Sequence, residues 1–124
     1  MLKFLNVAIG GALGAILRYS VSAWSCRFFT GKFPWGTLMI NLSGSLLIGF
    51  IWGICESRVV SHNLKLLIII GLLGSFTTFS TFSLENFHLL RDGHYPIALL
   101  NIAVSFILGI ALVVSGFQLS KILV

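Results

Sequence analysis

Four long runs of apolar residues, separated by short polar segments, divide this sequence. The runs cover residues 4–25, 34–55, 64–90 and 96–119. Each is long enough for an α-helix to cross the hydrocarbon core of a bilayer, which takes about 20 residues. Pro34 and Pro96 suit the first turn of a helix, and the polar segment that follows residue 90 has the composition of a tight turn. The pattern predicts an all-α membrane protein with four transmembrane helices, in which residues 1–124 form a single domain.

The third run changes character at Gly71–Ser83, where hydroxyl and phenylalanine side chains replace Leu and Ile. The residues after Gly74 have poor helix propensity, and non-helical backbone persists in a bilayer only inside protein or beside a hydrated cavity. We therefore expect a break in the third helix, whose freed carbonyls can hold a small cation. If the helix resumes, its side chains separate onto two arcs: Thr77, Ser80 and Thr81 on one, Phe79 and Phe82 on the other.

Polar residues also interrupt the other three runs. Arg18 lies inside the first, and it either extends its guanidinium to the headgroups or serves as a buried partner or an attractor of anions at a vestibule. Asn41 lies inside the second run and needs a hydrogen-bond partner at that depth. It either joins two helices or lines a polar pathway. Asn101 and Ser105 lie one turn apart on one face of the fourth run.

The composition excludes a soluble domain. Hydrophobic residues make up 57% of the chain and charged residues only 9%, against about 25% charged in soluble domains. The net charge of +5 comes from scattered single cations, which suits lipid headgroups better than nucleic acid. The few acids and histidines lack metal-ligand spacing, so zinc or iron chemistry is not expected. Cys26 and Cys55 fall on opposite membrane faces, so no disulfide between them is expected.

The cations near the ends of the runs are almost evenly divided between the two sides of the membrane. One side has Lys3, Arg58, Lys65 and Lys121, and the other has Arg27, Lys32 and Arg91, with Arg18 if it reaches that side. The positive-inside rule needs an asymmetry to fix one topology. We therefore expect insertion in both orientations and an antiparallel homodimer about a twofold axis in the membrane plane.

Three motifs resemble the CrcB/Fluc fluoride channel family across the whole chain. They are Gly10–Ala15 leading to Arg18-Tyr19, then Gly36–Gly44, then Gly71–Ser83 with its Thr-Thr-Phe-Ser-Thr-Phe-Ser sequence. The resemblance implies a fluoride-specific ion channel that lets fluoride leave the cytoplasm passively and so lowers its toxicity. It also implies a dual-topology antiparallel dimer in the bacterial inner membrane, with two pores at the subunit interface.

The same resemblance implies roles for individual residues. Phe79 and Phe82 match the two pore phenylalanines, Asn41 matches the pore asparagine, and Ser80 and Thr81 match hydroxyls that line the pathway. Gly74 and Thr77 match positions whose carbonyls hold a structural sodium ion that is not transported. Asn101 and Ser105 are candidate pore residues at positions where several relatives differ.

The residue chemistry is consistent with an anion pathway. Fluoride is strongly hydrated, so a dry pore must offer it amide and hydroxyl donors and the positive edges of aromatic rings. A small proton-coupled multidrug exporter of similar size is the alternative, but it needs a glutamate in the first helix, where this chain has none. A non-transporting assembly subunit leaves the hydroxyl–phenylalanine stretch unexplained, and no catalytic motif indicates an enzyme. Glu85 is either a vestibule residue or, as we expect, a residue at a solvated helix end.

Overall fold

The computed structural model describes residues 1–123, and the regular secondary structure in that range is all helical. Its elements are α1 (Leu2–Phe28), α2 (Trp35–Ser57), α3 (His62–Lys65), the π-helical η1 (Leu66–Leu73), α4 (Gly74–Phe76), α5 (Phe79–Arg91) and α6 (Tyr95–Leu123). Together they make 4 candidate membrane spans, because α3, η1, α4 and α5 lie within one span from His62 to Arg91. The prediction of four spans is confirmed.

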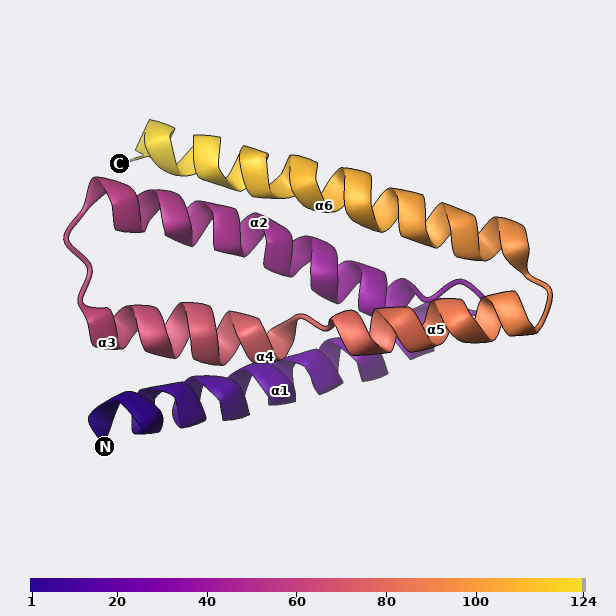
Figure 1. Ribbon diagram of the computed structural model, residues 1–124, viewed down its shortest axis with the longest axis horizontal. Helices are drawn as coiled ribbons and strands as arrows, with labels where there is room; N and C mark the ends of the chain where they lie inside the picture. The colour runs from indigo at the N-terminus through magenta and orange to yellow at the C-terminus, as the bar shows by residue number, and fades with distance from the viewer. Residues whose placement is uncertain (124) are drawn as a thin grey trace.

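The spans run up and down, so both ends of the chain lie at the same end of the bundle (Figure 1). The connection between α2 and α3 lies at that end too, whereas the α1–α2 and α5–α6 connections lie at the other. This arrangement agrees with the assignment of loop cations to two sides that the sequence predicts.

Most helix ends lie outside the boundaries expected from hydropathy, by one to four residues. The apolar run ends where the hydrocarbon core ends, but a helix continues through the interface, where polar residues still support it. The second helix is the exception at its start. Pro34, expected to open it, is the N-cap residue and Trp35 is the first helical residue.

Close contact between α1 and η1 depends on two glycines of α1, Gly10 and Gly14. A Cβ atom at Gly10 would collide with the backbone of Leu67, and one at Gly14 would collide with the backbone of Leu72. Only hydrogen atoms fit at these two positions, so the small-xxx-small pair brings the two backbones together. This contact holds the first half of the third span in place.

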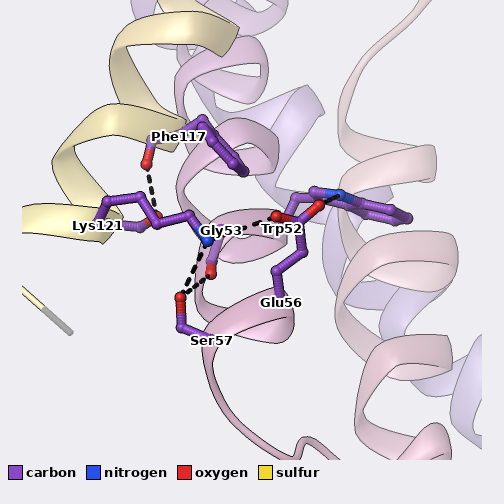
Figure 2. A network of polar contacts seen from close by, with 7 residues as sticks. Trp52, Gly53, Glu56, Ser57, Phe117 and Lys121 are labelled. Carbon is purple, nitrogen blue, oxygen red and sulfur yellow. Dashed lines mark hydrogen bonds and ion pairs between the residues drawn. The ribbon is translucent and has the colours of Figure 1, made fainter.

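The other main contact joins α2 and α6, which lie side by side (Figure 1). Polar side chains tie the two helices together at their C-terminal ends (Figure 2). Lys121 of α6 lies 3.1 Å from Ser57 Oγ and 3.4 Å from Glu56 Oε2, both on α2. Trp52 donates its indole N–H to Glu56 at 2.9 Å. Trp and Lys favour the membrane–water interface, so this network marks the boundary of the hydrocarbon core.

Candidate functional site

The predicted break in the third span is present, at Thr77 and Thr78. The helix that begins at His62 ends at Phe76, and both threonines have extended backbone before α5 begins at Phe79. The extended segment between α4 and α5 is visible in Figure 1. Main-chain groups that an intact helix would pair must find other partners here, since no water reaches them in a bilayer.

Asn41 of α2 supplies two of those partners. Its Nδ2 donates to the Thr78 carbonyl at 3.0 Å, and its Oδ1 accepts from the Thr78 N–H at 2.9 Å. Thr78 is only 8% exposed, so water cannot pair with its backbone groups and Asn41 does so instead. A side-chain amide has the same donor and acceptor as a peptide group. Asn41 therefore satisfies the N–H and the carbonyl of Thr78 in the way that a peptide group of an adjacent strand would.

The Thr78 side chain caps the helix that follows. Its Oγ1 accepts from the Thr81 N–H at 3.3 Å and donates to the Thr81 hydroxyl at 3.1 Å. Threonine at this position satisfies one of the free N–H groups in the first turn of a helix. The N-terminus of α5, with its partial positive charge, is thereby fixed beside the break.

Gly44, one turn after Asn41 on the same helix face, lets α2 approach the break. A Cβ atom at Gly44 would collide with the Thr77 side chain. Thr77 in turn donates its hydroxyl to the Leu73 carbonyl at 3.0 Å, which ends the preceding helix. Both residues of the break thus contact α2: Thr78 is bonded to Asn41, and Thr77 packs against Gly44.

A cleft of about 350 Å³ lies beside the break, at the face where α2, the third span and α6 meet. Its lining combines apolar side chains with a few polar ones and comprises Asn41, Gly44, Ser45, Ile48, Ile69, Leu73, Gly74, Thr77, Thr78, Phe79, Phe82, Ser105 and Phe106. Five of the predicted site residues with side chains meet here: Asn41, Thr77, Phe79, Phe82 and Ser105. No acidic or basic side chain is among these residues.

Three phenylalanines form one wall of the cleft. The ring centroids of Phe79 and Phe82 lie 5.9 Å apart. The rings of Phe82 and Phe106 meet edge to face, 6.2 Å apart with an interplanar angle of 79°. Phe79 is 73% exposed at the mouth of the cleft, whereas Phe82 is buried. Sequence reasoning missed Phe106, because a single phenylalanine in an apolar helix resembles an ordinary packing or lipid-facing residue.

Ser80 and Thr81 do not line the cleft in a single chain. Both are exposed on α5, and the Thr81 hydroxyl pairs with Thr78. Arg18 also lies away from it, half-buried on α1, and the salt bridges of the described residues do not include it. Both interpretations of Arg18 remain open. Pore roles for Ser80 and Thr81 stay predictions.

Asn101 lies behind the cleft wall and is not in the lining. It is 1% exposed, and its Nδ2 donates to Asn86 Oδ1 on α5 at 3.2 Å. Sequence reasoning missed Asn86, although it satisfies the same criterion as Asn41, an amide within an apolar span. The two amides face each other between α5 and α6. The part of Asn101 in conduction stays a prediction, and only its neighbour Ser105 reaches the cleft.

The expectation that Glu85 is solvated at a helix end is wrong. The residue is half-buried, its Oε1 accepts from the Thr37 hydroxyl at 2.7 Å, and its Oε2 is buried without a hydrogen bond. The reason is that Glu85 lies on the face of α5 that contacts α2, where the Thr37 hydroxyl reaches its carboxylate. Beyond the helix, Asp92 accepts from Arg91 at 2.8 Å, and this hydrogen bond lowers the pKa of Asp92.

The residues of the site fit a hard monovalent cation better than a transition metal. Among the described residues, no group of three or more His, Cys, Asp or Glu side chains is placed to hold a metal. Oxygen atoms are available instead. In an unbroken helix the Gly74 and Thr77 carbonyls would accept from the N–H groups of Thr78 and Thr81, but Asn41 Oδ1 and Thr78 Oγ1 accept from those groups here. Both residues line the cleft.

Comparison with known proteins gives a consistent result. Residues 5–117 match the model of the family described as CrcB-like protein, Camphor Resistance (CrcB). A protein of Parabacteroides distasonis named fluoride-specific ion channel FluC is 46% identical over 121 residues, which are 98% of this chain and 94% of that protein. Proteins of the same name from Maridesulfovibrio salexigens and Clostridium perfringens are 40% and 42% identical. They cover 100% and 99% of this chain, and 99% and 97% of their own lengths are matched.

Proposed function

This chain belongs to the CrcB family of membrane proteins, and we propose that it forms a fluoride-specific ion channel. Fluoride would leave the cytoplasm passively through this channel, down the fluoride gradient, which would lower the cytoplasmic fluoride concentration. The observation that carries the proposal is the cleft beside the broken helix, where amide and hydroxyl groups meet a wall of phenylalanines and no charged side chain enters.

Donors that remain free in the cleft support anion binding. The Asn41 amide nitrogen carries two protons, and only one is used on the Thr78 carbonyl. The second is available to an ion in the cleft. The capped N-terminus of α5 adds a partial positive charge beside it. With no acidic side chain in the lining, no fixed negative charge draws cations through the pathway.

The phenylalanines contribute through the edges of their rings. An aromatic ring is electropositive at its edge and electronegative on its face. The rings of Phe82 and Phe106 meet edge to face, so the wall contains ring edges as well as ring faces. Rings also exclude water, which strengthens the interaction of an anion with each remaining donor. The phenylalanine wall thus favours an ion that gives up its hydration shell.

A second copy of the chain completes the pathway in this proposal. The cleft is open, and in lipid its polar groups and extended backbone would face acyl chains, which bilayers do not tolerate. A partner over this face would cover Asn41, Thr77 and the exposed Phe79. It would also bring Ser80 and Thr81 of each chain to the interface between copies. Two related clefts then give two pores in one dimer.

The near balance of loop cations supports an antiparallel arrangement of the two copies. Neither end of the bundle has the excess of Lys and Arg that would fix one orientation. An antiparallel pair about a twofold axis in the membrane plane has isologous contacts and needs no second gene product. The multi-pass fold and the bacterial sources of the relatives support the inner membrane of a bacterium as its location.

A sodium ion on the axis of the dimer is part of the proposal. The Gly74 and Thr77 carbonyls would hold it, and it would add positive potential beside the pathway. The sodium ion can be tested without a transport assay. The purified protein is unfolded thermally in a sodium buffer and in an N-methylglucamine buffer. We expect a higher midpoint in sodium. Equal midpoints would contradict a structural ion.

The test of the channel is fluoride efflux from liposomes that contain the purified protein. We expect rapid fluoride loss, with chloride retained, and no dependence on a proton gradient. Proton-gradient dependence would instead favour the exporter. If liposomes bearing folded dimer retain fluoride, the proposed function is wrong.

The test of topology is a cysteine added after the last residue, in a chain whose Cys26 and Cys55 are replaced by alanine. Impermeant maleimide should label about half of the added cysteine in intact cells and the remainder after permeabilisation. Labelling from one side only would overturn the antiparallel arrangement. An added cysteine at the α1–α2 connection serves as the matched control from the opposite end.

A further inference from the structure

The buried amides of Asn86 and Asn101 form a chain of hydrogen bonds that ends in the cleft. Asn86 Nδ2 donates to the Phe82 carbonyl at 2.8 Å, and Asn101 Nδ2 donates to Asn86 Oδ1 at 3.2 Å. The Ser105 hydroxyl then donates to Asn101 Oδ1 at 3.4 Å. Asn86 and Asn101 are 5% and 1% exposed and lie outside the cleft lining, so Ser105 is the one polar side chain of this network that reaches the cleft.

The donor and acceptor roles in this hydrogen-bond network follow from the Phe82 carbonyl. A main-chain carbonyl can only accept, so Asn86 must turn its NH₂ group to Phe82 and its oxygen to Asn101. Asn101 must then turn its own NH₂ group to Asn86 and its oxygen to Ser105. Amide orientation is assigned from such networks rather than seen directly, and here a single acceptor fixes both amides.

The consequence falls on Ser105. Its one proton is drawn toward Asn101 and away from the cleft, so the hydroxyl offers the cleft its lone pairs. Lone pairs do not stabilise an anion. On the basis of the proposed fluoride channel, we infer that Asn86 is a positioning residue that, through Asn101, withholds the Ser105 proton from the ion. Asn86 thereby weakens ion binding at this point of the pathway.

The effect of replacing Asn86 then depends on whether residue 105 is serine. In Asn86→Leu, Asn101 loses its acceptor and can rotate, so that it donates to Ser105. The Ser105 proton then becomes free to face the cleft. One additional hydrogen bond should lower the half-saturating fluoride concentration by about threefold to tenfold. Maximal flux should fall as well, because a tighter site releases the ion more slowly.

The experiment measures flux against fluoride concentration for the wild type, Asn86→Leu, Ser105→Ala and the double variant. Ser105→Ala alone should change the half-saturating concentration by less than about twofold, and Asn86→Leu should cause no shift in the Ser105→Ala background. A shift of equal size in both backgrounds would overturn the inference. So would Ser105→Ala alone raising the half-saturating concentration more than about threefold.

Two controls separate the possible failures. Asn6→Leu makes the same substitution on α1, away from the cleft, and should leave both parameters unchanged. If Asn86→Leu does not assemble, Asn101→Leu removes the acceptor of Ser105 directly and should lower the half-saturating concentration in the same way; an unchanged value would overturn the inference. A wild type that holds fluoride would defeat the proposed function itself, whereas a conducting wild type with an unchanged Asn86→Leu defeats only this inference.

Discussion

Replacing Asn41 with leucine should separate the broken helix from α2. The substitution keeps a similar volume but removes both bonds to Thr78. It therefore leaves one N–H and one carbonyl unpaired at a residue that is almost fully buried. Gly44, which occupies the next turn on that face, has no side chain to replace the two bonds.

The expected cost follows from these two bonds. A buried polar group left without a partner costs about 1–3 kcal/mol, whereas an average side-chain hydrogen bond inside a membrane contributes only about 0.6 kcal/mol. Two bonds therefore bracket the loss between about 1 and 6 kcal/mol. The burial of Thr78 excludes rescue by water, and we expect about 3 kcal/mol, in the middle of this range.

The assay is equilibrium unfolding of the purified protein in mixed micelles with increasing SDS, with fluoride flux measured on the same preparations. Asn6→Leu is the control, since it makes the same chemical change on α1, and it should alter the free energy of unfolding by less than about 0.5 kcal/mol. The flux of Asn41→Leu should fall with its stability, because the free amide proton is lost as well. If Asn41→Leu and Asn6→Leu have the same free energy of unfolding, the two bonds to Thr78 do not stabilise the break.

Three further predictions follow from the packing. Phe79→Ile and Phe82→Ile should both reduce fluoride flux in liposomes, but only the second should destabilise the fold, by about 1 kcal/mol, because only Phe82 is buried. Gly49→Ala should cost about 1–3 kcal/mol in the same unfolding assay, since its Cβ atom would collide with the backbone of α6. Gly109→Ala should be neutral or stabilising, because its Cβ atom would make only an ordinary contact with Ser45 Oγ, at 3.7 Å. Lys121→Met should change stability by less than about 1 kcal/mol, because its ion pair is solvent-exposed.

The spans and the break were predictable because both depend on local composition. Hydropathy over about 20 residues identifies a crossing regardless of its neighbours. The two threonines of the break follow Gly74 in a stretch of poor helix formers, so the residues themselves indicate where the helix stops. By contrast, nothing in the apolar residues of η1 distinguishes a π-helix from an α-helix, since the same side chains suit both.

The contacts of the site were not predictable, because they join residues far apart in the sequence. The need of Asn41 for a partner follows from its type, but the identity of Thr78 as that partner depends on the register between α2 and the third span. The same holds for Glu85, whose bond to Thr37 spans two helices. Asn86 could have been recognised as a buried amide, although its pairing with Asn101 requires the packing of α5 on α6.

The break is best understood as a feature built jointly by two spans. The third span supplies two threonines with low helix propensity, which is sufficient to interrupt the helix but leaves polar backbone in lipid. The second span supplies an amide at position 41 to satisfy that backbone and a glycine at position 44 to admit it. These positions lie three residues apart and so share a helix face. Because the third span alone would leave unpaired backbone groups, the open cleft exists only where the two spans meet.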